Sequence, residues 1–217
     1  MNTTTLSERY ANIFSEVISM EQGIIVFLNG TSSSGKTSIS TQLINQDKQK
    51  FYHLSVDEFI KGIFEFLDAK YPDINPSTKE DEQKAFQILL DPIISMFYSS
   101  IKAFSAIGMN VVVDTVLDNE YWFNACLDLF KGHSILYVGV QCSLQELQRR
   151  EQLRGDRHIG LAQSQYNKVH SYGEYDIELN TEEMRPDECA NKIIEFIQSK
   201  NEFAAFKELT KRTSSIS

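Results

Sequence analysis

The sequence predicts an α/β protein, in which a five-stranded parallel sheet lies between two layers of helices. Short apolar segments alternate along the chain with segments in which apolar residues recur at helical spacing. The apolar segments are continuously hydrophobic, which is typical of strands buried on both faces of a parallel sheet. With 217 residues, of which 41% are hydrophobic and 24% are charged, the composition fits one globular domain.

The five expected strands follow one another with helices between them. They span residues 24–29, 52–56, 110–113, 135–140 and 175–179. Helices are expected after the first strand, from the second strand through Phe66, and over residues 122–130. Ser143 with Glu146 predicts the start of another helix, and Pro186 marks the first turn of a last one.

The same patterns divide the chain into a main domain and two extensions. We expect an amphipathic helix in residues 1–22, opened by a capping box of Thr5 and Glu8, and then a main domain in residues 23–203. Residues 204–217 are expected to form a C-terminal tail, and the last dozen residues are expected to be frayed.

Residues 58–109 form a long helical segment between the second and third expected strands. After a turn-rich stretch, Ser77 with Glu80 predicts the start of a helix, which Pro92 would kink or restart. Two interpretations are equally supported. The segment is either a cap over a substrate-binding cleft or an ordinary pair of surface helices whose apolar side faces the core.

The chain is acidic, because its 21 Lys and Arg are outnumbered by 30 Asp and Glu, which gives a net charge of −9. Such a surface repels polyanions, so nucleic-acid partners are not expected. The three cysteines lack metal-ligand spacing, and no apolar run approaches the ~20 residues of a membrane span. These features favour a cytoplasmic protein with reduced thiols and no membrane partner, and they leave the oligomeric state open.

Residues 30–37 match the pattern G-x-x-x-x-G-K-[ST] between an expected buried strand and an expected helix. In such a phosphate-binding loop, or P-loop, glycines let backbone N–H groups and the helix N-terminus point at phosphate oxygens. Lys36 is expected to bridge the β- and γ-phosphates, and the Thr37 hydroxyl is expected to bind Mg²⁺. The candidate nucleotide-binding residues are Gly30, Thr31, Ser32, Ser33, Ser34, Gly35, Lys36, Thr37 and Ser38.

Two aspartates follow expected strands at the edge of the sheet where open α/β folds bind their ligands. Asp57 follows the second strand, where its carboxylate can accept the proton of an attacking hydroxyl; alternatively, it caps the next helix. Asp114 ends the third strand, where an acidic residue can hold Mg²⁺ directly or through water. Asp57 is therefore the candidate catalytic base, and Asp114 joins Thr37 as a candidate metal residue.

Four arginines cluster within nine positions of this otherwise acidic chain: Arg149, Arg150, Arg154 and Arg157. Arginine makes bidentate contacts to phosphate oxygens and stabilises charge on a transferring phosphoryl group. We interpret Arg154 and Arg157 as catalytic residues of a lid in residues 153–160. A salt-bridged helix end with Glu146 and Glu151 explains Arg149 or Arg150.

Together these motifs resemble the chloramphenicol phosphotransferase-like family over about residues 23–198. The similar segments are residues 28–38, 56–57, 111–114, 137–142, 154–157, 169–170 and 175–176. The resemblance implies a P-loop kinase fold, the cofactors ATP and Mg²⁺, and transfer of the γ-phosphate to a hydroxyl of a small molecule. It also implies that Asp57 is the base, that residues 30–37 bind the phosphates, and that Arg154 and Arg157 belong to the lid.

Two departures from the family's chloramphenicol-modifying member fall where an acceptor would be recognised. This chain has a charged run at residues 79–82 and long helical patterns where that member has a glycine-rich, strand-like stretch. It also has Thr115 in place of a second acidic residue. The expected activity is therefore that of a chloramphenicol 3-O-phosphotransferase-like kinase with an open acceptor. The alternatives are a toxin-like kinase of a nucleotide-sugar or RNA, and a nucleotide-binding regulatory protein.

Overall fold

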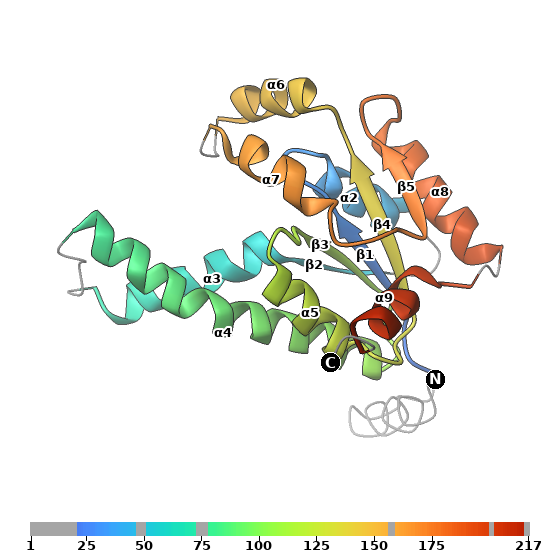
Figure 1. Cartoon of the computed structure of the whole chain (residues 1–217), viewed down its shortest axis with the longest axis horizontal. Coiled ribbons are helices and arrows are strands. Elements are labelled where there is room, and N and C mark those ends of the chain that lie inside the picture. The colour runs from blue at the N-terminus through green and yellow to red at the C-terminus, as the bar shows by residue number, and fades with distance from the viewer. Residues whose placement is uncertain (1–20, 47–50, 73–77, 156–158, 200–201, 215–217) are drawn as a thin grey trace, which may run out of the picture.

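The fold is built on one parallel sheet with helices on both of its faces (Figure 1). The computed structural model describes residues 21–46, 51–72, 78–155, 159–199 and 202–214. The strands are β1 (Ile25–Asn29), β2 (Tyr52–Ser55), β3 (Val111–Thr115), β4 (Ile135–Gln141) and β5 (Ile177–Asn180). The helices are α2 (Lys36–Gln46), α3 (Val56–Lys70), α4 (Lys79–Ala106), α5 (Glu120–Leu129), α6 (Leu144–Arg154), α7 (Leu161–Val169), α8 (Pro186–Gln198) and α9 (Ala205–Ser214).

The strand order is β2-β3-β1-β4-β5. β2 and β3 therefore lie on one side of β1, and β4 and β5, which follow them in the sequence, lie on the other side. β1 pairs with both β3 and β4, and Asn29 at its end is level with Thr115 and Gly139. Because all the strands are parallel, their carboxyl ends meet at one edge of the sheet, beside which α6 and α7 lie (Figure 1). The loop after β1 is therefore at the centre of the edge where such sheets bind ligands.

Alternate residues of the central strand face opposite layers of helices. Ile25 and Phe27 are fully buried in a cluster that includes residues of α4, α5 and α9. Val26 and Leu28 are fully buried on the other face, in a cluster with residues of α2 and α8. Burial on both faces explains why the strand is continuously hydrophobic. The predicted three-layer α/β/α arrangement is confirmed.

The segment between β2 and β3 forms an arm of two long helices, α3 and α4, that extends from the body of the molecule (Figure 1). The expected start of the second helix is wrong by one residue, because the N-cap is Thr78, whose hydroxyl accepts the backbone N–H of Asp81 at 3.2 Å. Ser77, the expected cap, lies outside the described residues. The expected restart at Pro92 is also wrong, since α4 runs through Pro92 without a break.

The C-terminal segment is part of the fold. Phe206 and Leu209 of α9 are buried in the same cluster as Phe27 of β1. Asp176 Oδ1 accepts the backbone N–H groups of Ala204 and Ala205, at 2.8 and 2.9 Å, and so fixes the start of α9. The expected fraying is therefore wrong for residues 206–214. The expected helix in residues 1–22 falls almost entirely outside the described residues.

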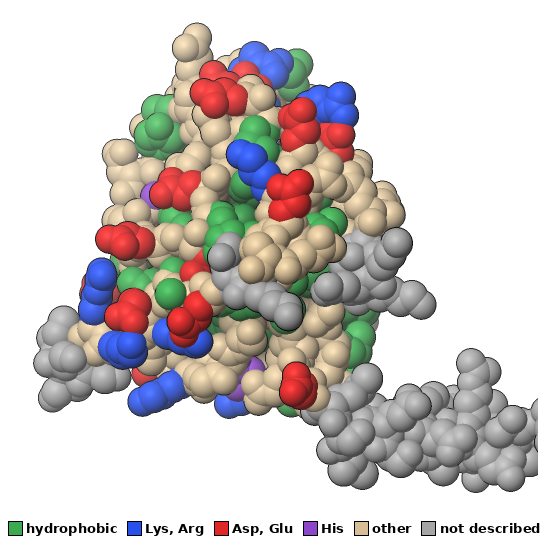
Figure 2. Space-filling model, turned by 90° about the vertical axis from the view of Figure 1, so that its right-hand side faces the viewer, with side chains coloured by type: hydrophobic (Ala, Val, Ile, Leu, Met, Phe, Trp, Pro, Cys, Tyr) green, Lys and Arg blue, Asp and Glu red, His purple; other side chains and the backbone are tan. Residues whose placement is uncertain are grey.

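The surface mixes charges of both signs. On the face shown in Figure 2, acidic and basic side chains are interspersed with smaller apolar areas. Among the described helices, none is long and apolar enough to cross a membrane. Cys126, Cys142 and Cys189 are buried as free thiols, and burial raises the pKa of each one.

Candidate active site

The loop between β1 and α2 is curled by backbone angles that most residues avoid. Gly35 has a φ of 93°, and Ser33 has a φ of 64°, in the left-handed region. Gly30 is required for a different reason, since a Cβ atom there would lie 2.6 Å from the carbonyl oxygen of Val140 on β4. The sequence pattern thus corresponds to a real structural constraint, which turns the chain sharply from the strand into the helix.

Hydroxyl groups in this loop lack the partners that buried polar groups normally have. The side-chain oxygens of Ser32, Ser33 and Ser34 are buried, and none has a hydrogen-bond partner in the described part of the chain. Ser32 is only 6% exposed and Ser34 is fully buried. An unpaired buried hydroxyl is costly, so a loop with three of them is suited to a ligand that accepts hydrogen bonds. Phosphate oxygens are such acceptors.

Lys36 is folded into the loop as the first residue of α2. Its ammonium group donates to the carbonyl oxygens of Gly30 and Thr31, at 2.9 and 2.8 Å, and is only 3.8 Å from Asp114 Oδ1. The side chain is 7% exposed. A buried positive charge beside unpaired hydroxyl donors is suited to bind an anion, which is the role predicted for this lysine.

The two predicted metal residues lie in direct contact. Thr37 Oγ1 donates to Asp114 Oδ2 at 2.5 Å, although the two residues are 77 positions apart. Asp114 is the fourth residue of β3 and lies level with Leu28 of β1, which places it beside the P-loop. A hydroxyl and a carboxylate are oxygen ligands of the kind that Mg²⁺ takes together with substrate phosphates. The pair therefore fits a magnesium ion shared with a nucleotide.

Asp57 lies in the first turn of α3 and lines the same cleft as the P-loop. The N-cap of α3 is Ser55, whose hydroxyl accepts the backbone N–H of Glu58 at 3.5 Å. The alternative interpretation of Asp57 as the helix cap is therefore wrong. The expected strand also ends one residue early, at Ser55, so that Asp57 is carried by the start of a helix.

One cleft of about 840 Å³ joins most of the predicted site residues. The P-loop lines one part of it, together with Arg154 of α6, while Asp57 and α4 line another part. The predicted site residues that line the cleft are Ser32, Ser33, Gly35, Lys36, Thr37, Ser38, Asp57, Asp114 and Arg154. Arg157 lies outside the described residues.

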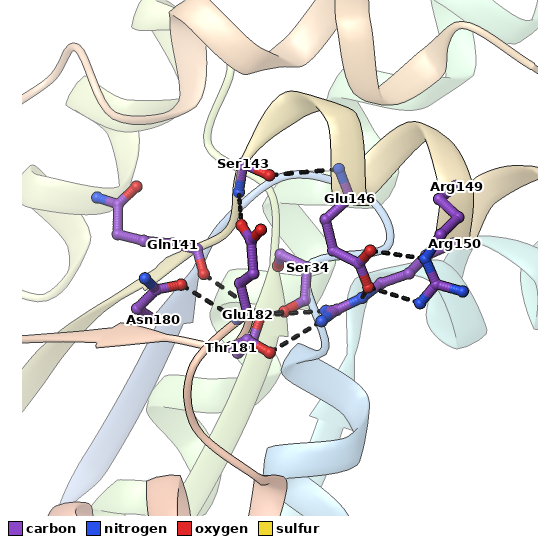
Figure 3. Close-up of polar contacts among 9 residues, drawn as sticks. All are labelled: Ser34, Gln141, Ser143, Glu146, Arg149, Arg150, Asn180, Thr181 and Glu182. Carbon is purple, nitrogen blue, oxygen red and sulfur yellow. Dashed lines mark hydrogen bonds and ion pairs between the residues drawn. The ribbon is translucent and has the colours of Figure 1, made fainter.

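Arg150 also lines this cleft, and a network of polar contacts holds it there (Figure 3). Its Nε donates to Glu146 at 2.7 Å, and its two terminal nitrogens donate to the hydroxyl and carbonyl oxygens of Thr181, at 3.1 and 2.8 Å. The Thr181 hydroxyl in turn donates to the carbonyl oxygen of Ser34 at 2.8 Å. The arginine is thus attached to the P-loop through one side chain.

Glu146 forms the salt-bridged helix end that the sequence predicts. Its carboxylate accepts from Arg149 and from Arg150, which lower its pKa to about 2. The prediction that Glu151 shares this role is wrong. Glu151 is buried and accepts the backbone N–H groups of Gly160 and Ala162, at 2.8 and 3.0 Å, so it caps the start of α7. Although burial raises the pKa of Glu151, these backbone donors lower it overall.

Gln165 of α7 is a cleft residue that the sequence analysis missed. Its side-chain oxygen accepts the backbone N–H of Ser32 in the P-loop at 2.8 Å. At the other end of α7, Asn29 Nδ2 donates to the carbonyl oxygen of Val169 at 2.9 Å. No local pattern marks these contacts, because they join residues more than 130 positions apart.

Asp118 and Trp122 also line the cleft and were not predicted. Burial raises the pKa of Asp118, an effect that Lys168 and the Gln165 amide partly offset. Two signals could have drawn attention to these residues. Asp118 follows Asp114 by four positions in the loop after a central strand, and Trp122 is the only tryptophan of the sequence.

Solved kinase structures share this fold. The APS kinase of Mycobacterium tuberculosis, solved with AMPPNP and APS, has a TM-score of 0.58 and 16% identity, with 82% of this chain and 99% of that chain covered. A gluconokinase from Sinorhizobium meliloti has a TM-score of 0.50 and 16% identity, with 91% and 99% covered. The likeness confirms a P-loop kinase fold, and at these identities it concerns the fold alone.

Sequence relatives extend the comparison beyond the fold. Proteins from two strains of Mycobacterium tuberculosis, each provisionally named an O-phosphotransferase, are 31% identical over 222 residues. The alignment covers 98% of this chain and 99% of each relative. A sequence model described as chloramphenicol phosphotransferase-like protein matches residues 23–198. The chain therefore belongs to the chloramphenicol phosphotransferase-like family, and it is a phosphotransferase of the P-loop type.

Proposed function

We propose that this protein is an ATP-dependent kinase that transfers the γ-phosphate to a hydroxyl group of a small molecule. The observation that carries the proposal is the single cleft in which the P-loop and Asp57 meet. A protein that only binds a nucleotide needs no carboxylate on the far side of the phosphates. A kinase does need one, because the attacking hydroxyl must lose its proton.

The transfer is a substitution at phosphorus. The acceptor oxygen forms a bond to the γ-phosphorus while the bond from that phosphorus to the oxygen shared with the β-phosphate breaks. ADP leaves with the shared oxygen, and Asp57 takes the proton of the acceptor hydroxyl. Little covalent chemistry is left to the protein, so positioning and charge stabilisation provide most of the rate enhancement.

The remaining site residues would hold the nucleotide and the metal ion. Backbone N–H groups of residues 30–38 and the ammonium group of Lys36 would bind the phosphates. Arg154 would stabilise the charge of the transferring group, with Arg157 as a further lid residue. Thr37 and Asp114 would hold Mg²⁺, which neutralises phosphate charge when bound.

Two larger segments have roles in the same proposal. Residues 153–160 would act as the lid over the phosphates, because Arg154 lies on the cleft at the end of α6. Residues 58–109 would act as the cap over the acceptor, because α3 and α4 both contribute lining side chains. Both segments lie within the main domain expected in residues 23–203.

The proposal is tested by γ-phosphate transfer from labelled ATP to a panel of hydroxylated metabolites, aminoglycosides, chloramphenicol and nucleosides. We expect a phosphorylated product that Lys36→Ala does not form. We expect Asp57→Asn to lower kcat by about 10²–10⁴-fold while ATP still binds. Asp68→Asn, an exposed residue farther along α3, is the matched control and should keep full activity. Unchanged turnover in Asp57→Asn would contradict the assignment of the base.

A further inference from the structure

Apart from Asp114, which lies beside Lys36, the acidic and the basic side chains that line the cleft come from different elements. Lys36, Arg150 and Arg154 line the part next to the P-loop. Asp57 and Asp118 line the part formed by α3, the start of α5 and the loop between β3 and α5, which we call the acceptor half. Among the described lining residues, none in the acceptor half is a lysine or an arginine. The unpartnered buried hydroxyls of Ser32 and Ser33 mark the P-loop part of the cleft as a ligand site.

The acceptor half also has an apolar wall with two aromatic rings. Its members are Ile60, Phe86, Leu90, Ile94 and Trp122, which come from three different helices. Phe86 is 43% exposed, although it is a large aromatic side chain. A wall of this composition is suited to cover the flat or apolar part of a small molecule.

Trp122 is fixed in place by a third acidic residue. Its indole N–H donates to Asp91 Oδ1 on α4 at 2.7 Å. Trp122 also lines a second cavity of about 160 Å³ between α4 and α5, so this residue borders both spaces. A cation over the face of an indole ring is attracted by the ring's negative π-surface, and the neighbouring carboxylate adds to this attraction.

Asp118 lacks a close ion-pair partner on the same side of the cleft. It is half-buried, and no lysine or arginine of the described chain lies within 4 Å of its carboxylate as an ion pair. The groups that act on it are Lys168, Gln165 and, at its backbone oxygen, the hydroxyl of Tyr172. A half-buried carboxylate is stabilised by a bound cation, because water solvates its charge only in part.

We propose that the acceptor is an alcohol that carries an ammonium group beside an apolar or aromatic ring. The ring would lie on the apolar wall, and the ammonium group would lie between Asp118 and the indole of Trp122. This inference rests on the proposed kinase function of the same cleft. It disfavours acceptors that carry phosphate, such as a nucleotide-sugar or an RNA, because the acceptor half would repel them.

Three probes with one skeleton and different charges test this inference: phenylalaninol, N-acetylphenylalaninol and N-succinylphenylalaninol. The first is cationic at pH 7, the second is neutral and the third is anionic. Because Trp122 is the only tryptophan of the chain, its fluorescence reports binding at the apolar wall directly. We expect phenylalaninol to bind about tenfold more tightly than the neutral probe, and the anionic probe to bind most weakly.

Asp118→Asn should bring the affinities for the cationic and neutral probes to within about twofold of each other. Asp128→Asn removes the same charge from the exposed side of α5, outside the cleft, and should leave the preference unchanged. Urea denaturation of each variant checks that the fold is retained.

Three outcomes would overturn the inference: equal affinities for the three probes, tighter binding of the anionic probe, or no fluorescence change with any probe. The measurement needs no nucleotide, so it is independent of the transfer reaction. The cationic probe could bind preferentially while the transfer assay with labelled ATP gives no phosphorylated product. That pair of results would contradict the proposed kinase function and leave the acceptor-half inference standing.

Discussion

Arg149 and Arg150 are adjacent residues that share the carboxylate of Glu146 but have different surroundings. Arg149 is exposed and donates to Glu146, whereas Arg150 also donates to Thr181 and lines the cleft. A guanidinium group can make these contacts at once because its donors are arranged in a rigid fork. A lysine has one charged nitrogen and cannot bridge the same groups.

Arg150→Lys should therefore weaken nucleotide binding through the loss of the contacts that hold the side chain at the P-loop. We expect the KM for ATP to rise about tenfold, with a smaller change in kcat. Arg149→Lys is the matched control, since it changes the same residue type one position away and outside the cleft. Steady-state kinetics of the two variants measure the KM for ATP. Equal KM values for ATP in the two variants would exclude a role for Arg150 in nucleotide binding.

At the level of secondary structure, α7 is held to the rest of the fold along its whole length. Glu151 caps its first turn, Gln165 contacts the P-loop from its middle, and Asn29 contacts its last residue. These contacts make α7 a fixed wall of the cleft.

Glu151→Ala should loosen α7, because it leaves buried backbone N–H groups at the start of the helix without acceptors. We expect the free energy of unfolding to fall by about 2 kcal/mol, the cost of losing such a cap and leaving its partners unpaired. Urea denaturation measures this change, and hydrogen exchange at residues 161–165 should become faster. Glu195→Ala, at an exposed position of α8, should change neither quantity.

For the molecule as a whole, each face of the sheet has its own hydrophobic cluster, to which the helices covering that face contribute buried side chains. α9 completes the cluster that contains Phe27, since the ring of Phe206 lies 6.1 Å from that of Phe27 and 5.5 Å from that of Tyr137. The C-terminal helix is therefore a structural part of the domain. The expected domain end at residue 203 stays a prediction for the catalytic region alone.

Phe206→Ala should destabilise the whole protein, because the cavity lies against the central strand. We expect the free energy of unfolding to fall by about 3–5 kcal/mol, as for other buried phenylalanines. Thermal or urea unfolding measures the change. Arg212→Ala, at an exposed position of the same helix, serves as the control, and an equal effect of both variants would mean that α9 does not pack as described.

The residues that could be predicted are those whose roles follow from local patterns. Gly30 and Gly35 are set by the turn from strand to helix, and the strand-end rule located Asp57 and Asp114. Glu151 was assigned wrongly because Arg154, three residues away, is a plausible partner, whereas its real partners are backbone groups at the start of the next helix. Gln165 was missed because an amide side chain carries no signal of its own, and Asp118 offered only its position in the loop after a central strand.

The sequence by itself determined the fold class, the P-loop, and the positions of Asp114 beside it and of Asp57 on the same cleft, because each of these depends on residues that are neighbours along the chain. Only the tertiary structure decided how the cleft is completed. Contacts such as Ser32 with Gln165 and Ser34 with Thr181 join residues 133 and 147 positions apart. Such pairs are brought together by the order of strands in the sheet and by packing of helices on it, and these depend on the whole chain at once.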